Sequence, residues 1–267
     1  MIRNPAVAGQ FYPGTKAGLQ KEMEKYIIKG AEKIEAFGVV SPHAGYVYSG
    51  AVAGATLSSV ELAHTCVVMG PNHTGKGRPF SIMTEGAWKM PFGDCNIDGN
   101  LAKVILSDSE FLEEDDEAQR YEHSVEVQVP FLQALNENVK IVPLVIASAD
   151  LDTYRKIGKG IAKSIRKMKM PATIIASSDL THYEPQDVAN KKDKKVIDAI
   201  LGLDEAALIE ATARYDISMC GYAPVCVMLA ASKELGAKHA RLIKYQTSGD
   251  VTGDYDAVVG YGGIVIY

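Results

Sequence analysis

The chain has 267 residues, of which 47% are hydrophobic and 23% charged, so it can bury a sizeable core. Its formal net charge of −5 argues against the clustered positive charge that is typical of nucleic-acid-binding proteins. It also shows no apolar run of the ~18 residues that a membrane span needs, no signal-like start and no CxxC pair, so we expect a cytoplasmic protein with reduced thiols and no membrane partner.

Short apolar runs alternate with segments of helical periodicity along the whole chain. Several runs are continuous in valine and isoleucine, which is typical of strands buried on both faces. We predict strands at 37–41, 65–70, 80–84, 140–146, 172–177 and 240–246, and a final pair in "DAVVG" and "GGIVIY". Helices are predicted over 15–29, 50–60, 99–107, 151–168, 185–201, 204–213 and 223–235.

This alternation of strands and helices predicts an α/β fold. We expect a single domain over residues 1–267, with a mainly parallel or mixed central sheet that helices cover on both faces. The acidic segment 109–119 is predicted to be an exposed loop. The glycines between the last two strands predict an antiparallel hairpin at the end of the chain.

Polar side chains with metal-binding chemistry follow three of the predicted strands. His43 follows the first strand in "PHAGY", and His73 follows the second in "PNH". Asp179 and His182 follow a later strand in "SDLTHY". Because open α/β sheets bind ligands beyond the carboxyl ends of their strands, we expect these side chains to converge.

Two further motifs begin predicted helices. His123 and Glu126 lie in "EHSVEVQ", at the start of a helix that Pro130 should kink or restart. Cys220 lies in "SMCGY", just before the helix 223–235. Imidazole nitrogen and thiolate sulfur are good ligands for iron, copper and zinc, and three such ligands leave positions open for water, oxygen or substrate.

Each of these side chains also has a purely structural explanation. A histidine or aspartate can cap a helix, two polar residues three apart can bond within a helix, and a cysteine can be a small buried hydrophobe. Five independent structural roles would seldom all use side chains that can bind a metal at one edge of a sheet, so one shared functional site is the better explanation. The remaining histidines, His64 and His239, lie outside these motifs and are expected at the surface.

The motifs together resemble those of a known family. "SPHAGYVYSG", "GPNHTG", "EHSVEVQVPFL", "SSDLTHY" and "CGYAPV", with the opening "AVAGQFYP", are similar to the Memo family, whose archaeal and bacterial members are called AmmeMemoRadiSam system protein B. The resemblance covers essentially the whole chain. It implies a fold similar to that of class III extradiol dioxygenases, which are non-heme iron enzymes.

The resemblance also implies roles for individual residues. His43, His73 and Cys220 would be the metal ligands, with the cysteine in place of the glutamate that the dioxygenases use. The same pocket would hold a catalytic group in which a histidine moves protons beside a carboxylate. That group consists of His182, Asp179, His123 and Glu126.

Two functions are consistent with this reading. The first is a metal-dependent oxidoreductase of unknown substrate, with iron as the expected metal and copper or zinc as alternatives, since a thiolate softens the site. The second is a non-catalytic module that binds a ligand or phosphopeptide in a vestigial dioxygenase site. Metal-assisted hydrolysis is a third, weaker hypothesis. The expected partners are a small molecule or peptide and, by family association, AMMECR1-like and radical-SAM proteins.

Overall fold

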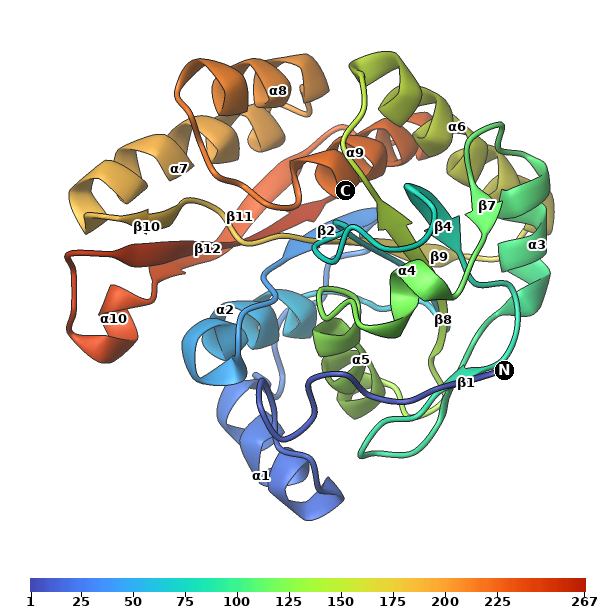
Figure 1. The fold of residues 1–267 in the computed structure, drawn as a ribbon, viewed down its shortest axis with the longest axis horizontal. Helices are drawn as coiled ribbons and strands as arrows, with labels where there is room; N and C mark the ends of the chain where they lie inside the picture. The colour runs from blue at the N-terminus through green and yellow to red at the C-terminus, as the bar shows by residue number, and fades with distance from the viewer.

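The computed structural model describes residues 1–267 and contains a large mixed sheet with helices on both faces (Figure 1). The strands of this sheet are β2 (Gly38–Ser41), β3 (Thr65–Gly70), β4 (Phe80–Ile82), β7 (Glu113–Glu114), β8 (Lys140–Ile146), β9 (Ala172–Ser177), β10 (His182–Glu184), β11 (Ala240–Thr247) and β12 (Val258–Ile266). Their order is β10-β12-β2-β9-β3-β8-β4-β7, with β11 paired to β12. A small second sheet contains β1 (Ile2–Arg3), β5 (Ala87–Trp88) and β6 (Cys95–Asn96).

Helices cover both faces of the main sheet. Their bounds are α1 (Lys16–Tyr26), α2 (Tyr46–Ser58), α3 (Gly99–Ser107), α4 (Glu117–Arg120), α5 (Val129–Leu135), α6 (Leu151–Met168), α7 (Gln186–Leu201), α8 (Glu205–Arg214), α9 (Tyr222–Leu235) and α10 (Gly249–Thr252). A 3-10 turn, η1 (Glu126–Gln128), precedes α5. In Figure 1, α1, α2 and α5 lie on one side of the sheet and α6 to α9 on the other. The predicted α/β fold with a mixed central sheet is confirmed.

Four parallel strands, β2, β9, β3 and β8, form the centre of the sheet. Their valines and isoleucines are buried, because helices cover both faces of these strands. The outer strands β12 and β4 run antiparallel to their inner neighbours, which makes the sheet mixed. One cluster of 61 buried hydrophobic residues runs through the whole fold, from Tyr12 to Ile266.

The first residues of several helices are fixed by capping side chains. Asp98, Asp150 and Asp204 each accept a hydrogen bond from the backbone N–H three residues further on, at the starts of α3, α6 and α8. Pro130 lies in the first turn of α5, where its missing N–H costs no helical hydrogen bond. The α-helix that is expected to start at the His123 motif therefore begins only at Val129, one residue before Pro130 and directly after η1.

The predicted hairpin at the end of the chain is wrong, because "DAVVG" and "GGIVIY" belong to one continuous strand, β12. Its glycines permit close packing instead of a turn. A Cβ on Gly260 would lie 1.8 Å from the Asp193 carboxylate, and one on Gly263 would lie 1.8 Å from the hydroxyl of Thr56. The strand therefore uses glycine where helices α7 and α2 come too near for a side chain.

The acidic segment 109–119 is also not entirely a loop. It contains β7, which pairs with β4 at the sheet edge, and the first turn of α4. The Asp115 carboxylate organises this turn by accepting hydrogen bonds from the backbone of Arg78, Glu117 and Ala118. The charges of the segment thus serve partly as backbone caps, a role that charge patterning alone does not show.

Candidate metal centre

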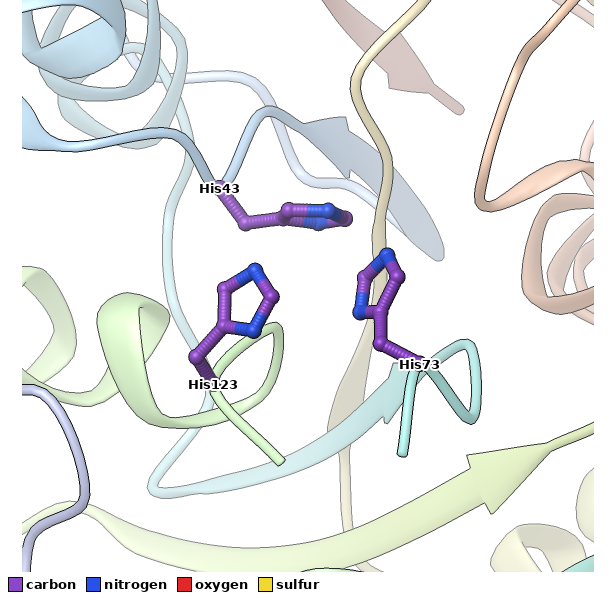
Figure 2. A group of neighbouring side chains, drawn as sticks. All are labelled: His43, His73 and His123. Carbon is purple, nitrogen blue, oxygen red and sulfur yellow. The ribbon is translucent and has the colours of Figure 1, made fainter. Parts of the chain in front are cut away.

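Three histidines from distant segments point toward one another at the carboxyl edge of the central strands (Figure 2). His43 follows β2, His73 follows β3, and His123 lies between α4 and η1. Their ligand atoms all lie within 4.8 Å of one another. Nitrogen ligands at about 2.1 Å from a tetrahedral metal are about 3.4 Å apart, so small side-chain rotations bring these three onto one ion.

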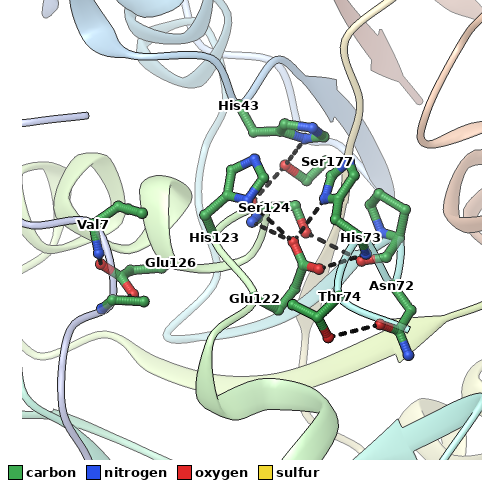
Figure 3. A network of polar contacts seen from close by, with 12 residues as sticks. Val7, His43, Asn72, His73, Thr74, Glu122, His123, Ser124, Glu126 and Ser177 are labelled. Atoms are coloured by element: carbon green, nitrogen blue, oxygen red, sulfur yellow. Dashed lines mark hydrogen bonds and ion pairs between the residues drawn. The ribbon is translucent and has the colours of Figure 1, made fainter. Parts of the chain in front are cut away.

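The ring of His43 is held by a hydrogen bond from the far side of the site (Figure 3). Its Nδ1 lies 3.0 Å from Ser177 Oγ, at the end of β9. That hydroxyl already donates its proton to Ser124 O at 2.7 Å and accepts one from Gln128 Nε2 at 2.7 Å. His43 Nδ1 must therefore carry the hydrogen, which leaves Nε2 as an unprotonated acceptor that faces Cys220 Sγ and that a metal can bind in place of the thiol proton.

His73 is held in the same way by a buried carboxylate. Glu122 accepts hydrogen bonds from His73 Nδ1 at 2.9 Å and from the His73 backbone at 2.7 Å. Although burial raises the pKa of Glu122, the hydrogen bonds from His73 and Ser124 outweigh it and lower the pKa to about 2. An ionised acceptor on Nδ1 turns Nε2 of His73 toward the centre and strengthens it as a ligand.

His123 completes the group of imidazoles. Its ring stacks on that of His73 with centroids 4.7 Å apart, and Phe11 covers it at 5.0 Å. Burial lowers the pKa of His123, and it also lowers that of His43, where the neighbouring imidazoles add to the effect. Both rings are therefore neutral near pH 7, which is the form that binds metal.

Cys220 lies beside this group. Its Sγ is 3.2 Å from His43 Nε2, and it accepts the backbone N–H of Asp179 at 3.3 Å. Burial, followed by the nearby Asp179 carboxylate, raises the pKa of the thiol. The structure thus gathers three imidazoles, with the sulfur next to one of them, where the family resemblance implies two imidazoles and a thiolate.

Asp179 and His182 lie next to the histidine group and line the same cavity. Asp179 accepts the backbone N–H of His43 at 2.8 Å, so it fixes the loop that carries this ligand. Burial raises the pKa of its carboxyl above the ordinary value. His182 Nδ1 is buried and has no hydrogen-bond partner within the protein, so no hydrogen bond fixes the tautomer of this ring.

Glu126 does not line this cavity. Its carboxylate accepts hydrogen bonds from Arg3 Nη1 at 2.6 Å and Tyr12 Oη at 2.7 Å, and from the backbone of Ala6 and Val7. It therefore ties down the N-terminal segment, which in turn places Phe11 over His123. His64 and His239, which are expected at the surface, are exposed.

The histidine group forms the floor of a cavity of about 920 Å³. The N-terminal segment, the start of α2, the His182 strand and the loop before β12 form its walls. His73 and Cys220 also border a smaller cavity of about 440 Å³ on the other side. A centre between two cavities has room for a bound organic molecule and for a second, smaller reactant.

Sequence reasoning missed the two residues that orient the ligands, Glu122 and Ser177. The signals were present, since Glu122 immediately precedes His123 and Ser177 is the last residue of a predicted strand. A metal-bound histidine almost always donates its other N–H to a carboxylate, carbonyl or similar acceptor. A search for such acceptors near each histidine motif could have proposed both.

These observations define an α/β protein with a candidate mononuclear metal centre at the carboxyl ends of its parallel strands. The family description "Memo-like protein" matches residues 3–265, and the chain belongs to this Memo family. It is 44% identical to a MEMO1 family protein of Methanopyrus kandleri over 279 residues, covering 99% of each chain. It is also 44% identical to one of Pyrobaculum aerophilum, covering 100% of this chain and 99% of that one.

A solved structure supports the fold independently of sequence. The uncharacterized protein JW3007 of Escherichia coli K12 matches with a TM-score of 0.53 at 13% identity. The match covers 76% of this chain and 86% of that chain. No helix of the structure is long and apolar enough to cross a membrane.

Proposed function

We propose that the chain is a metal-dependent oxidoreductase with one metal ion on His43, His73 and His123. The observation that carries this proposal is the convergence of three imidazoles, two of them with Nδ1 already hydrogen-bonded, on the floor of a large cavity. We propose iron as the native metal, with copper and zinc as alternatives for an imidazole site with a nearby sulfur. The likeness to extradiol dioxygenases belongs to the same proposal.

The metal would supply open coordination positions and a redox centre, or Lewis acidity if it is zinc. The protein's own groups divide the remaining work. Ser177 and Glu122 fix the orientation of His43 and His73, and Asp179 holds the backbone of His43. His182, which lines the same cavity, would exchange a proton with the bound molecule.

The alternative is a module that binds a ligand or phosphopeptide without chemistry. No lysine or arginine lines the large cavity, so a module that binds without a metal would offer a phosphate no permanently positive side chain there. A purely structural cluster also has no need for buried acceptors that keep the hydrogen on Nδ1 and leave Nε2 of His43 and His73 unprotonated. We therefore favour the metal enzyme.

The test is elemental analysis of protein purified without oxygen, followed by metal titration of single variants. His43→Ala, His73→Ala and His123→Ala should each lower affinity for added Fe(II) or Zn(II) at least tenfold. His64→Ala and His239→Ala are the controls, because both histidines are exposed. Wild-type protein that takes up no iron, copper or zinc contradicts the proposal.

Cys220→Ala decides the composition of the ligand set. Loss of the metal in Cys220→Ala with retention in His123→Ala would indicate the two-histidine, one-thiolate site that the family resemblance implies. The opposite result would give the three-imidazole site that the geometry favours. The proposed association with AMMECR1-like and radical-SAM proteins is tested separately, by mixing the purified proteins and measuring complex formation.

A further inference from the structure

The charge of the large cavity carries information about its ligand. Of its 23 lining residues none is a lysine or arginine, whereas three carry carboxylates. The three are Glu22, Asp179 and Asp254. An anion that enters the metal-free cavity loses hydration and meets no lysine or arginine, which is a large unfavourable term.

The carboxylates differ in how free they are. Asp179 is buried and accepts the backbone N–H of His43, and Glu22 pairs with Lys25 at 2.7 Å. Asp254 is exposed at the rim, and the Asp256 backbone N–H is its one hydrogen-bond donor within the protein. Asp254 is therefore the carboxylate that can meet a cation at the cavity mouth.

The walls of the cavity are aromatic. Six rings line it, and they belong to Phe11, Tyr12, Tyr46, Tyr48, Tyr183 and Tyr261. The hydroxyls of Tyr12 and Tyr46 donate hydrogen bonds to Glu126 and to Val127 O, and both residues are almost fully buried. The ring surface that a ligand can reach therefore comes mainly from Phe11, Tyr48 and Tyr183. Such surface suits a flat apolar body, and ring faces also attract cations.

One aromatic side chain is held at the mouth at a conformational cost. Tyr183 is 77% exposed and has a φ of 58°, in the left-handed region that non-glycine residues rarely adopt. Val47 and Tyr48, also exposed, lie on the same cavity wall. An exposed apolar rim around a deep cavity is typical of a ligand-binding entrance.

We propose that this cavity binds a small aromatic molecule that is uncharged or cationic, with an amine near Asp254, and rejects anionic ligands. This inference rests on the proposed function in that the bound molecule is the substrate of the metal centre. The aromatic body lies among the tyrosines and Phe11, and the imidazoles lie below it. Discrimination by charge comes from the rim and walls, so it is measured without the metal ion, whose own charge would attract an anion.

The test uses three probes of similar shape and different charge: tyramine, para-ethylphenol and para-hydroxyphenylpropionate. Binding is measured calorimetrically and by ligand-observed NMR on chelator-treated protein, because a bound zinc ion would itself attract an anionic probe. Tyramine should bind at least tenfold more tightly than the propionate, with the neutral phenol in between. Equal or tighter binding of the propionate or of phosphotyrosine, or no binding of any probe at millimolar concentration, overturns the proposal.

Variants separate the two parts of the proposal. Asp254→Asn should reduce the preference for tyramine over para-ethylphenol severalfold, whereas Asp256→Asn, a neighbouring exposed carboxylate outside this cavity, should leave it unchanged. Tyr183→Ala should weaken all three probes alike. If wild-type protein shows this order of affinities but takes up no metal, only the proposed metal-dependent activity is refuted. If it binds metal but shows no preference by ligand charge, only the proposed ligand class is refuted.

Discussion

The role of each imidazole is decided by the partner of its second nitrogen. His43 Nδ1 donates to a hydroxyl whose own proton is committed elsewhere, and His73 Nδ1 donates to a buried carboxylate. In both cases the tautomer that leaves Nε2 free is the one that satisfies the hydrogen bonds. The hydrogen-bond network therefore prepares the two rings for a ligand before any is bound.

Glu122→Gln tests this preparation. The substitution keeps the shape but removes the charge that His73 Nδ1 faces, so we expect zinc or iron affinity to fall about 10- to 100-fold. Competition titration against a chelator of known affinity measures the change. Glu137→Gln, at an exposed position, is the control, and an affinity within twofold of wild type would contradict the argument.

Acidification of the metal-free protein tests the neutral state of the rings. Burial lowers the pKa of His43 and of His123 in the folded protein, while in the unfolded chain both titrate near the ordinary value. Below about pH 6.5 the unfolded state therefore binds more protons, and the free energy of unfolding falls by up to about 1.4 kcal/mol per pH unit for each histidine.

Urea denaturation at several pH values from about 7.5 down to about 5.5 measures this slope, and His123→Gln should flatten it. His239→Gln changes an exposed histidine and should leave the slope unchanged. A wild-type slope indistinguishable from that of His123→Gln would show that His123 is not held neutral by burial.

At the scale of elements, the sequence predicts the helices and strands whose bounds depend on local pattern. It does not predict those whose conformation is determined by tertiary contacts. The helix 151–168 and the strands 65–70 and 172–177 are found at the predicted bounds, since caps and apolar periodicity determine them. The glycines of β12 resemble a turn sequence, because no local feature of the sequence indicates that the side chains of Asp193 and Thr56 approach them. The same holds for the orienting residues of the site, whose partners are distant in sequence.

Gly260→Ala tests the close approach in β12. Asp193, which the new Cβ would meet at 1.8 Å, is buried and holds the Thr181 N–H and the Tyr245 hydroxyl. Its displacement breaks these bonds, so we expect a loss of about 2 kcal/mol or more in the free energy of unfolding. Gly202→Ala, which meets only ordinary contacts, should change stability by less than about 0.5 kcal/mol.

The N-terminal segment is held as an element by one buried ion pair, Arg3 to Glu126 at 2.6 Å. Arg3→Met removes the cation and leaves a buried carboxylate, so we expect a destabilisation of about 3–5 kcal/mol by urea denaturation. Hydrogen exchange should rise most in residues 4–12, which this carboxylate also bonds through Ala6 and Val7. Uniformly raised exchange would contradict a local anchor, and the exposed Lys16→Met is the control.

At the scale of the whole molecule, the metal centre joins parts of the chain that are far apart. Residues 43, 73 and 123 come from three connections of the fold, and a fourth contact, Ser177, ends β9 at the middle of the sheet. The unfolded chain does not bring these groups together. An ion bound here therefore binds the folded state alone and shifts the global unfolding equilibrium.

Metal addition should thus raise the free energy of unfolding by about 2.7 kcal/mol at a free concentration one hundred times the dissociation constant. Urea denaturation of chelator-treated and zinc-loaded protein measures the difference. His73→Ala should lose this increment. Its metal-free stability should fall as well, because buried Glu122 loses a hydrogen-bond donor, so each protein is compared with its own metal-free form. An equal increment in wild type and His73→Ala would mean that the ion binds elsewhere on the surface. Only a centre that includes the His73 imidazole requires the folded arrangement of the three segments that carry residues 43, 73 and 123.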